Sequence, residues 1–406
     1  MTEVIKKYKI GILSTHPIQY YVPWYRRLTS YPEIELEVFY CHAQSPADQA
    51  QAGFDVSFNW DIPLFEGYKY RFLNNKSRHP NVYTFFGCNT PEIKQVISQG
   101  SYDAFIVQGW YVLSFWQAII ACWKTHTPLL VRGDSQLEFS IYAVTKGLKY
   151  PFYRWFIPRF DAYLVVGRRN REYYLHYGAR PERMFFAPHC VDNDYFSHSH
   201  DILKAQREKL RQNLGIPPQA LVFLFAGKLI SRKRPQDFLA ALRLAAEKVG
   251  DIHGLIVGDG PLRNELQAYS KKHGLPVTFT GFLNQRALPE AYAVSDILTI
   301  TSKERETWGL VVNEAMASEL PVIVSNESGC QPDLVLPGQT GERFPSGDIN
   351  KLADLFVAFS CKRMQLEEMG KKSLQLIQRY SVDQAAGGVL AALHAVVGKK
   401  KDVFAK

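Results

Sequence analysis

The feature that most constrains the fold is a regular alternation between short apolar runs and helical segments in the second half of the chain. Helical patterns cover about Pro235–Lys248 and begin again near Leu262. Between and around them lie runs rich in β-branched and aromatic residues, at Leu221–Ala226, His253–Val257, Val277–Thr280, Ile297–Thr301 and Pro321–Val324. Strands that alternate with helices at this spacing predict a parallel sheet covered by helices on both faces.

The first half of the chain has the same alternation. Its predicted strands are Lys9–Ser14, Glu35–Tyr40, Ala104–Val107, Leu129–Arg132 and Ala162–Val166. A chain of 406 residues is long enough for two such domains. We therefore predict an α/β fold of two Rossmann-like domains, with parallel sheets flanked by helices. A ligand site is expected in the interdomain cleft, at the carboxyl ends of the strands.

Aromatic composition indicates where the two domains meet. Residues 1–200 carry 41 of the 54 Phe, Tyr and Trp side chains, so the composition changes near residue 200. We expect an N-terminal domain at 1–200 and a C-terminal domain at 201–380, joined through a charged helical stretch at 198–215. The last helix, at about 380–406, is expected to pack back onto the first domain.

Charge and cysteine usage exclude several classes of protein. The six cysteines are scattered and form no CxxC pair, which argues against a disulfide framework or structural zinc and fits a reducing cytoplasm. The net charge of +9 is spread along the chain, whereas nucleic-acid binders concentrate charge on one face or arm. We expect no nucleic-acid partner. A positive balance suits an anionic partner such as a nucleotide diphosphate.

Three segments bear on membrane contact. The first 13 residues lack a cleavage site and are expected to enter a first strand rather than to form a signal peptide. Ala104–Cys122 carries no formal charge, but two glutamines interrupt it, and a strand followed by a buried helix explains it. Residues 146–159, KGLKYPFYRWFIPR, interleave basic and aromatic side chains. That pattern is typical either of a helix packed on the sheet or of a surface at the inner face of an anionic membrane.

The strongest chemical signal is the segment ETWGLVVNE, in which seven residues separate Glu306 from Glu314. Gly309 lies where a helix is predicted to begin. Because a helix N-terminus presents free N–H groups, the backbone of Gly309, Leu310 and Val311 suits a diphosphate. Glu314 suits ribose hydroxyls and Glu306 suits sugar hydroxyls. The alternative is a capped amphipathic helix with solvated glutamates.

This segment, followed by AMA, resembles the E-x7-E signature of the retaining glycosyltransferases of family 4, which have the GT-B fold. The resemblance extends from Leu221 to about Leu355 and, more loosely, across nearly the whole chain. It implies that Glu306 contacts the donor sugar, that Glu314 contacts the ribose, and that Trp308 and the backbone after it contribute to donor binding.

The same resemblance covers a basic turn that follows Gly227. The family usually has Arg where Lys228 stands and Gly where Arg234 stands, and a second cation falls at Lys233. A departing diphosphate develops negative charge, which a cation stabilises by about 3 kcal/mol. The resemblance therefore implies that Lys228 and Lys233 assist departure. A solvated basic turn is the alternative.

Two further turns belong to the resemblance. Gly258-Asp259-Gly260-Pro261 is similar to the family's G-x-G-P turn, although tight strand-to-helix geometry explains it equally well. Gly281-Phe282-Leu283 stands where the family reads the nucleotide base through backbone atoms. Backbone readout leaves the base itself unidentified.

The N-terminal half departs from the family pattern. Where many members have a Gly-rich loop, this chain has THPIQYY, and His16 is expected either to contact acceptor or phosphate or to be structural. Asp134 follows Arg132-Gly133 where the family often has a His-Asp pair, so it is a candidate to position acceptor or donor. Asp192-Asn193-Asp194 imitates a metal-binding DxD motif but falls in an expected interdomain turn. We expect no metal and no cofactor.

These observations predict a cytoplasmic enzyme that moves a hexose-type sugar from a nucleotide diphosphate sugar to a hydroxyl acceptor. The resemblance implies retention of configuration. A glycan, a lipid-linked sugar and a small metabolite all remain open as acceptors. The alternatives are a nucleotide-sugar 2-epimerase of the same fold and an inactive carbohydrate-binding descendant. A nicotinamide oxidoreductase would need a GxGxxG after the first strand, and residues 15–21 contain none.

Overall fold

The computed structural model describes residues 7–49, 53, 55–137, 143–303 and 306–404, in two compact units. The first unit comprises 1–44, 63–189 and 382–406, and the second comprises 45–62 and 190–381. The division thus falls between His189 and Cys190 rather than near residue 200. Residues 45–62 group with the second unit, although their place in the sequence puts them in the first half.

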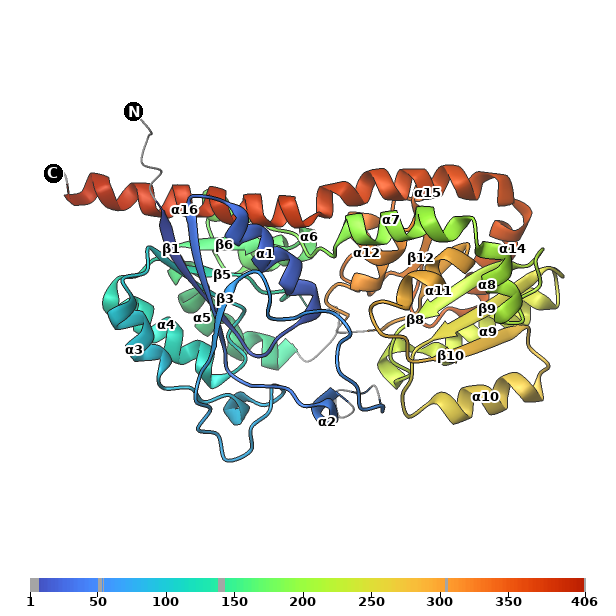
Figure 1. The fold of residues 1–406 in the computed structure, drawn as a ribbon, viewed down its shortest axis with the longest axis horizontal. Coiled ribbons are helices and arrows are strands. Elements are labelled where there is room, and N and C mark those ends of the chain that lie inside the picture. The colour runs from blue at the N-terminus through green and yellow to red at the C-terminus, as the bar shows by residue number, and fades with distance from the viewer. Residues whose placement is uncertain (1–6, 50–52, 54, 138–142, 304–305, 405–406) are drawn as a thin grey trace. The chain divides into compact units, whose positions relative to one another are not determined.

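The first unit is built on a seven-stranded parallel sheet with the strand order β3-β2-β1-β4-β5-β6-β7 (Figure 1). Its strands are β1 (Tyr8–Ser14), β2 (Ile34–Tyr40), β3 (Lys69–Phe72), β4 (Ala104–Val107), β5 (Leu129–Val131), β6 (Ala162–Val165) and β7 (Met184–Phe186). Its helices are α1 (Val22–Ser30), α3 (Ile93–Gly100), α4 (Leu113–Thr125), α5 (Ala143–Phe156), α6 (Arg168–His176) and α16 (Val382–Phe404). The strand order reverses direction between β1 and β4, which marks the ligand-binding edge of a doubly wound sheet.

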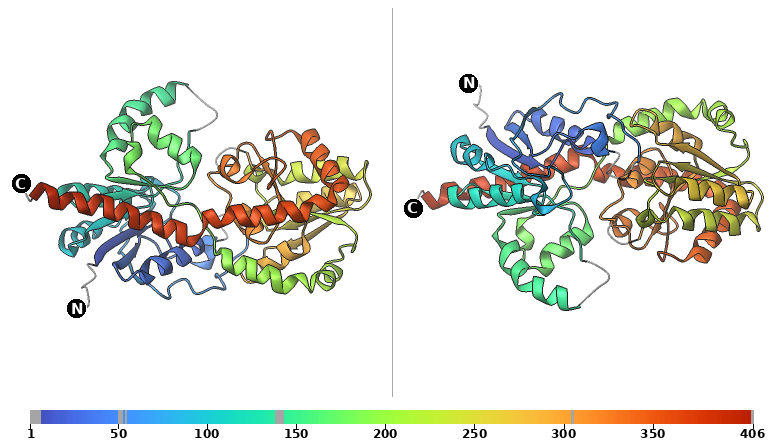
Figure 2. Two further views of the ribbon diagram at one scale, coloured as in Figure 1. Left: turned by 90° about the horizontal axis from the view of Figure 1, so that it is seen from above. Right: turned by 90° about the horizontal axis from the view of Figure 1, so that it is seen from below.

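Helix α16 joins the first unit although it ends the chain. It packs against α1 and β7, and Figure 2 shows it alongside this sheet in both views. The close approach depends on Gly388, because a Cβ there would lie 2.0 Å from the carbonyl oxygen of Phe186.

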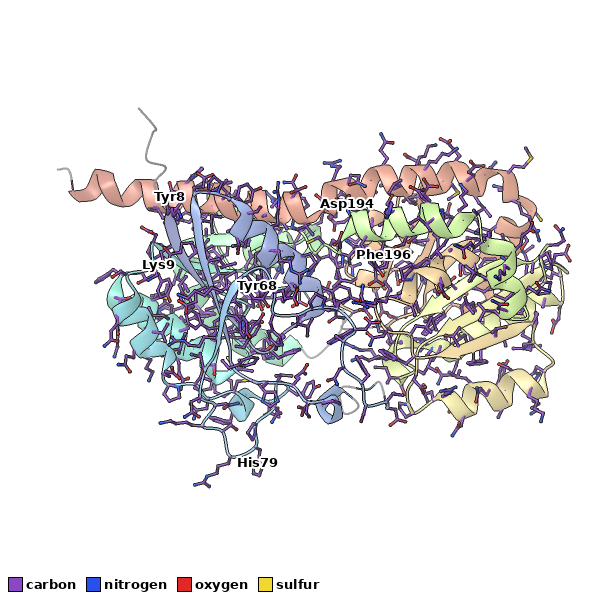
Figure 3. The ribbon with its side chains drawn as sticks, in the orientation of Figure 1. Tyr8, Lys9, Tyr68, His79, Asp194 and Phe196 are labelled. Carbon is purple, nitrogen blue, oxygen red and sulfur yellow. The ribbon has the colours of Figure 1, made fainter. Side chains whose placement is uncertain are left out.

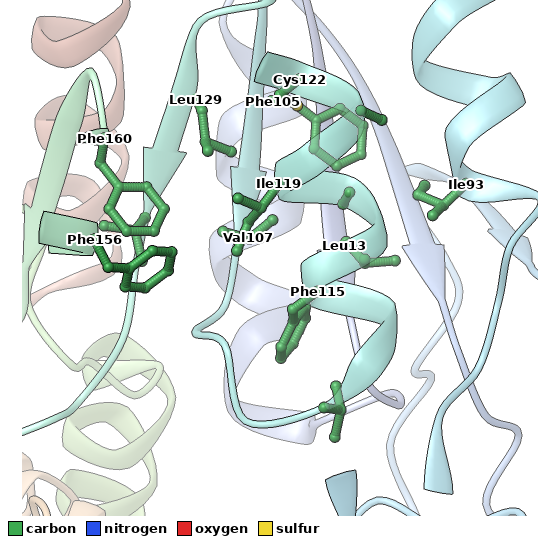
Figure 4. Packing of buried hydrophobic residues seen from close by; sticks show 14 of the residues in the cluster. Leu13, Ile93, Phe105, Val107, Phe115, Ile119, Cys122, Leu129, Phe156 and Phe160 are labelled. Atoms are coloured by element: carbon green, nitrogen blue, oxygen red, sulfur yellow. The ribbon is translucent and has the colours of Figure 1, made fainter. Parts of the chain in front are cut away.

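The core of the first unit lies between the sheet and helices α4 and α5. Phe105 and Val107 of β4 pack with Phe115 and Ile119 of α4, all fully buried, and Phe156 of α5 extends the cluster (Figure 4). Ala104–Cys122 is therefore a strand followed by a buried helix, as predicted. None of the helices, over the residues described, is long and apolar enough to cross a membrane.

The second unit is built on a six-stranded parallel sheet with the order β10-β9-β8-β11-β12-β13. Its strands are β8 (Leu221–Ala226), β9 (Ile252–Val257), β10 (Val277–Gly281), β11 (Ile297–Ile300), β12 (Val322–Ser325) and β13 (Gly341–Phe344). Its helices are α2 (Pro46–Gln49), α7 (Asn193–Lys204), α8 (Arg207–Asn213), α9 (Pro235–Ala246), α10 (Arg263–Lys272), α11 (Leu288–Val294), α12 (Leu310–Ala317), α13 (Gln331–Leu334), α14 (Ile349–Cys361) and α15 (Arg363–Ile377). The order reverses between β8 and β11. The predicted α/β fold of two parallel sheets with flanking helices is confirmed.

Helix α7 shows how the DxD-like triplet is used. Asp192 accepts a hydrogen bond from the Tyr195 backbone N–H at 3.0 Å and so caps the helix. Phe196, which is one turn further along and is labelled in Figure 3, packs from α7 onto Tyr292 of α11. The two ring centroids are 5.8 Å apart. The triplet begins a helix that packs on α11 and α12 of the second unit.

A partly buried ion network fastens α8 to the second sheet. The Asp296 carboxylate accepts hydrogen bonds from Arg207 at 2.6 Å, from Arg211 at 2.8 Å and from the Val222 backbone N–H of β8 at 2.7 Å. The Arg211 guanidinium also donates to the carbonyl oxygens of Pro218, Ala220 and Val294. Removing one member of such a network leaves the others buried without compensation.

We therefore expect Asp296→Ala to destabilise the second unit by about 3 kcal/mol, because two arginines would lose their shared carboxylate. Hydrogen exchange of β8 and β11 peptides would measure this loss for that unit alone. Asp354→Ala is the matched control, since this carboxylate is exposed and forms a surface ion pair with Lys248. Equal protection in the two variants would contradict the assignment.

Candidate functional site

The candidate site lies at the carboxyl edge of the second sheet, where glycines let three turns pack backbone against backbone. A Cβ on Gly258, which follows β9, would lie 2.0 Å from the Gly227 carbonyl oxygen after β8. A Cβ on Gly260 would lie 2.7 Å from the Leu229 carbonyl oxygen. The Gly258 N–H donates to the Gly281 carbonyl at the end of β10, at 2.8 Å. The predicted Gly227, Gly258 and Gly281 turns therefore form one continuous edge.

An ion pair stands at the centre of this edge. The Lys233 ammonium donates to Oε2 of Glu306, which also accepts a hydrogen bond from the Ser302 hydroxyl at 3.0 Å. The Lys233 stem passes Gly227, whose Cβ position would be 4.0 Å from Lys233 Cε. Lys233 and Glu306 are 73 residues apart in sequence, and the fold brings them together.

Burial and mutual charge govern both ionisable groups. Burial disfavours the charged Glu306, but the Lys233 ammonium, the Arg232 charge and the Ser302 hydroxyl together outweigh it and lower the pKa of this carboxyl. Burial, together with repulsion from Lys233 and Arg232, lowers the pKa of Lys228 to about 8 from its ordinary 10.5. The edge is therefore crowded with positive charge, and an anion there would relieve the repulsion.

The backbone of the basic turn shows how Arg234 is accommodated where the family usually has Gly. Arg234 has φ +50° and ψ +48°, the left-handed region that glycine adopts without strain. The Arg234 side chain pairs with Asp237 of α9, and the Thr301 hydroxyl donates to the carbonyl oxygens of Lys233 and Arg234. These contacts hold Arg234 in the left-handed conformation, which glycine adopts more easily than other residues.

Helix α12 begins directly after the loop that carries Glu306. Gly309 is its N-cap residue with φ +101°, and the first turn that follows contains no acidic side chain. The Trp308 indole is buried and donates to Asn313 Oδ1 at 2.7 Å, so it anchors the loop rather than facing an open edge. The backbone of Leu310 and Val311 forms the positive end of the helix.

Glu314 lies one turn into α12 and is fully buried. Its Oε2 accepts a hydrogen bond from the Tyr292 hydroxyl of α11 at 2.6 Å. Tyr292 is a site residue that the sequence analysis missed, because nothing in the local sequence links a helix tyrosine to a glutamate 22 positions away.

Phe282 and Leu283, the remaining residues predicted to bind the donor, follow Gly281 at the end of β10. Both side chains are half-buried. The Phe282 ring packs on Phe58 of the 45–62 stretch, with ring centroids 4.2 Å apart. This contact could not be foreseen from the sequence, since 224 positions separate the two rings.

The first unit holds the two acceptor-side candidates. His16 follows β1, and its Nδ1 lies 3.0 Å from the Thr15 hydroxyl, which is itself 3.4 Å from the Tyr111 hydroxyl. Asp134 follows β5 and is exposed. The charge of Asp134 reaches the Tyr111 hydroxyl and contributes to raising the pKa of that phenol, although burial contributes more. Tyr111 thus interacts with both the Thr15–His16 pair and Asp134, and the sequence analysis did not predict it.

Arg132, just before Asp134, has a structural role in the conformation described. It is buried, donates to the Pro188 carbonyl at 2.9 Å and lies over the rings of Tyr21 and Trp24. These contacts fix the end of β5 and the chain beside it.

Comparisons with known proteins agree with this architecture. Residues 206–375 match the family model described as glycosyl transferases group 1. The sulfoquinovosyl transferase SQD2 of Arabidopsis thaliana is 31% identical over 193 residues, which cover 47% of this chain and 36% of that protein. The alpha-D-kanosaminyltransferase of Streptomyces kanamyceticus is 26% identical, over 48% of this chain and 50% of that protein. The chain thus spans half or less of these two relatives.

Solved structures match over nearly the whole chain. Anabaena Alr3699/HepE in complex with UDP gives a TM-score of 0.71 at 18% identity, covering 96% of this chain and 100% of that one. The same protein with UDP-glucose gives 0.67 at 18% identity, over 95% and 99%. At this identity the match concerns the fold.

The two parallel sheets and their match to solved structures define the fold, which is the GT-B fold. Within it, the segment 206–375 belongs to the glycosyl transferases group 1 family. The resemblance to family 4 inferred from the E-x7-E segment is confirmed over these residues.

The lowered pKa of Lys228 gives a prediction that does not depend on substrate. After reductive ¹³C-methylation, the Lys228 resonance should titrate with a midpoint near pH 8, because burial and two neighbouring cations oppose its charge. Lys228→Arg would assign the resonance by removing it. A midpoint close to the ordinary 10.5 would contradict the crowded geometry.

Proposed function

We propose that this protein is a retaining glycosyltransferase that moves a hexose-type sugar from a nucleotide diphosphate sugar to a hydroxyl acceptor. The observation that carries the proposal is the Lys233–Glu306 pair, flanked by Lys228, beside the positive end of α12. Cations, a helix N-terminus and a buried carboxylate at one sheet edge suit a group that is anionic at one end and rich in hydroxyls at the other.

Each group then has a role in donor binding. The backbone at Gly309–Val311 and the ammonium groups of Lys228 and Lys233 hold the diphosphate. Glu314, oriented by the Tyr292 hydroxyl, accepts from the ribose hydroxyls. Glu306, held by Lys233, accepts from a hydroxyl of the sugar. The turns at Gly258 and at Gly281–Leu283 border the nucleoside.

The chemistry needs no covalent intermediate on the protein. The bond between the anomeric carbon and the diphosphate oxygen breaks, and both electrons leave with the diphosphate. The acceptor oxygen bonds to the same face of the anomeric carbon, and its proton passes to the departing phosphate. Lys228 and Lys233 stabilise the charge that develops there, which is electrostatic catalysis by prearranged groups.

The similar proteins support a uridine nucleotide as the first donor to test. HepE was solved with UDP and with UDP-glucose, and the two relatives with partial coverage are named for the different sugar groups that they transfer, sulfoquinovosyl and kanosaminyl. Since neither name specifies an acceptor, the acceptor of this chain is best sought by activity. The exposed Asp134 and the half-buried His16 are proposed to contact it.

Substitution of the ion pair tests the proposal. Lys233→Met and Glu306→Gln should each lower transfer about 100- to 1,000-fold, because each removes a contact to the diphosphate or to the sugar. Nucleotide release from UDP-, GDP- and ADP-hexoses, with and without a panel of acceptors, is the measurement. The matched controls are Lys248→Met and Glu247→Gln, exposed members of surface ion pairs.

The rival activities give distinct results in the same assay. A 2-epimerase would release nucleotide and free sugar at a rate that acceptors do not change. An inactive descendant would bind a nucleotide sugar without turnover. Near-normal transfer by Lys233→Met and Glu306→Gln would refute the site assignment.

We also propose that helices α4 and α5 of the first unit contact an anionic membrane surface. Residues 113–125 and 143–159 contain five basic side chains and no acidic one. Tyr150, Phe152 and Trp155 of α5 are 40–48% exposed, and Ile120 of α4 is 41% exposed. Figure 2 shows α5 at the periphery of this unit, on the side away from α1. The side chains of residues 143–148 lie outside the described part of the structure.

The side chains of α5 fall into two groups, one packed inside the first unit and one exposed. Phe156 faces inward and is fully buried, with Trp116 of α4 stacked 4.7 Å from it. Arg159 lies over the Trp155 ring at 4.0 Å. One face of α5 therefore packs on α4, while the other presents aromatic and basic groups, as interfacial helices do.

Vesicle sedimentation tests the membrane contact. Trp155→Ala combined with Lys149→Glu should weaken binding to vesicles containing 30% phosphatidylserine by about 20-fold, because both an interfacial ring and a cation are lost. Phe86→Ala with Lys94→Glu, an exposed ring and cation elsewhere on the first unit, should change it little. If neither the wild type nor the control variant binds these vesicles, the proposal is overturned.

A further inference from the structure

A stretch that leaves the first unit lies on the donor edge of the second. Residues 45–62 connect β2 to β3 of the first sheet, yet they belong to the second unit. The chain therefore passes between the units at four places, 44/45, 62/63, 189/190 and 381/382. Two of these passages exist only because this stretch packs where it does.

The described segment 55–62 is held at the turn that follows β10. Asn284 donates through Nδ2 to the Asn59 carbonyl oxygen at 2.7 Å. The Arg286 backbone N–H donates to the Asp61 carboxylate at 3.2 Å. Both contacts fall within five residues of Gly281, where the site proposed above borders the nucleoside.

An aromatic pair forms at the same place. The Phe58 and Phe282 rings lie 4.2 Å apart with an interplanar angle of 33°, and the Trp60 ring meets Phe58 edge-on at 4.9 Å. Phe58, Trp60 and Phe282 are all half-buried. A partly open group of rings beside backbone that ends a strand is suited to a flat aromatic ligand.

The stretch also reaches the basic turn after β8. A Cβ on Gly53 would lie 3.6 Å from Lys228 Cδ and 3.7 Å from Ile230 Cγ2. Gly53 thus lies beside the turn after β8, and the segment 55–62 lies beside the turn after β10, the two strands that flank β9 in the sheet. One end is beside a cation proposed to hold the diphosphate, and the other is beside Phe282.

We propose that the segment 55–62 completes the donor site, with Phe58 and Phe282 forming an aromatic wall against which the nucleobase packs. This inference rests on the proposed function. The donor pocket would then be built by chain from both halves of the sequence, and donor affinity would depend on a loop that the 206–375 family segment does not contain.

Calorimetric titration with two ligands tests the wall. Phe58→Ala should weaken binding of UDP, GDP or ADP about tenfold, because one ring that stacks on the base is lost. The same variant should bind inorganic pyrophosphate within twofold of wild type, because pyrophosphate has no base. Phe58→Trp should restore nucleotide binding. Phe65→Ala, an exposed ring of the first unit, is the matched control.

A second variant tests the same segment without changing either ring. Asp61→Ala keeps both rings but removes the carboxylate that accepts from Arg286, so it should also weaken nucleotide more than pyrophosphate. Hydrogen exchange of peptides covering 55–62 in the full chain should slow on addition of nucleotide and not on addition of pyrophosphate.

The outcomes separate this inference from the function beneath it. If wild type binds a nucleoside diphosphate and Phe58→Ala binds it equally well, the aromatic wall is overturned while the proposed function stands. Tighter nucleotide binding by Phe58→Ala would show that the segment competes with the base, which also overturns it. If wild type binds no nucleoside diphosphate, the proposed function is overturned together with this inference.

Discussion

Concentrated positive charge at the carboxyl edge of the second sheet is the constraint on which the candidate site depends. Lys228 and Lys233 stand on one short turn, and the buried Glu306 pairs with Lys233. Such an arrangement is stable only if the turn is held rigidly and the carboxylate stays ionised. The glycine turns, the left-handed Arg234 and the Ser302 hydroxyl supply that rigidity. The local structure around the edge follows from the need to keep these charges together.

Much of the fold could be predicted because the central strands of a doubly wound sheet are buried on both faces. Their apolar runs mark ten of the thirteen strands described, including β4, β8 and β9, within about one residue at each end. The missed strands β3, β7 and β13 lie at sheet edges, where fewer neighbours bury them. In β3 all four residues are exposed, so no apolar run could mark it. These three edge strands therefore carry little sequence signal, whereas the edge strand β10 keeps a β-rich run at Val277–Thr280.

The site divides in the same way between local and non-local information. The candidates Glu306, Gly309 and Glu314 were found because they share one strand–helix segment with a strong pattern. Tyr292 and Phe58 were missed because they approach that edge from other elements, 22 and 224 positions away from the residues they contact. The assignment of residues 45–62 to the second unit also depends on non-local contacts, since the composition near residue 50 does not indicate with which unit the segment packs.

The Lys228 environment also suggests why the chain tolerates lysine where its family usually has arginine. A guanidinium keeps its charge in almost any setting, so a third permanent cation beside Lys233 and Arg232 would repel both at all pH values. An ammonium can instead lose its proton when burial and its neighbours oppose the charge, and for Lys228 the pKa is lowered to about 8. A diphosphate that arrives at the edge reverses the balance, because its negative charge favours the protonated amine. Donor binding would then be coupled to proton uptake at Lys228. Before the donor binds, an uncharged Lys228 would lessen the repulsion among the three cations. After it binds, the charge needed to stabilise the diphosphate would be restored.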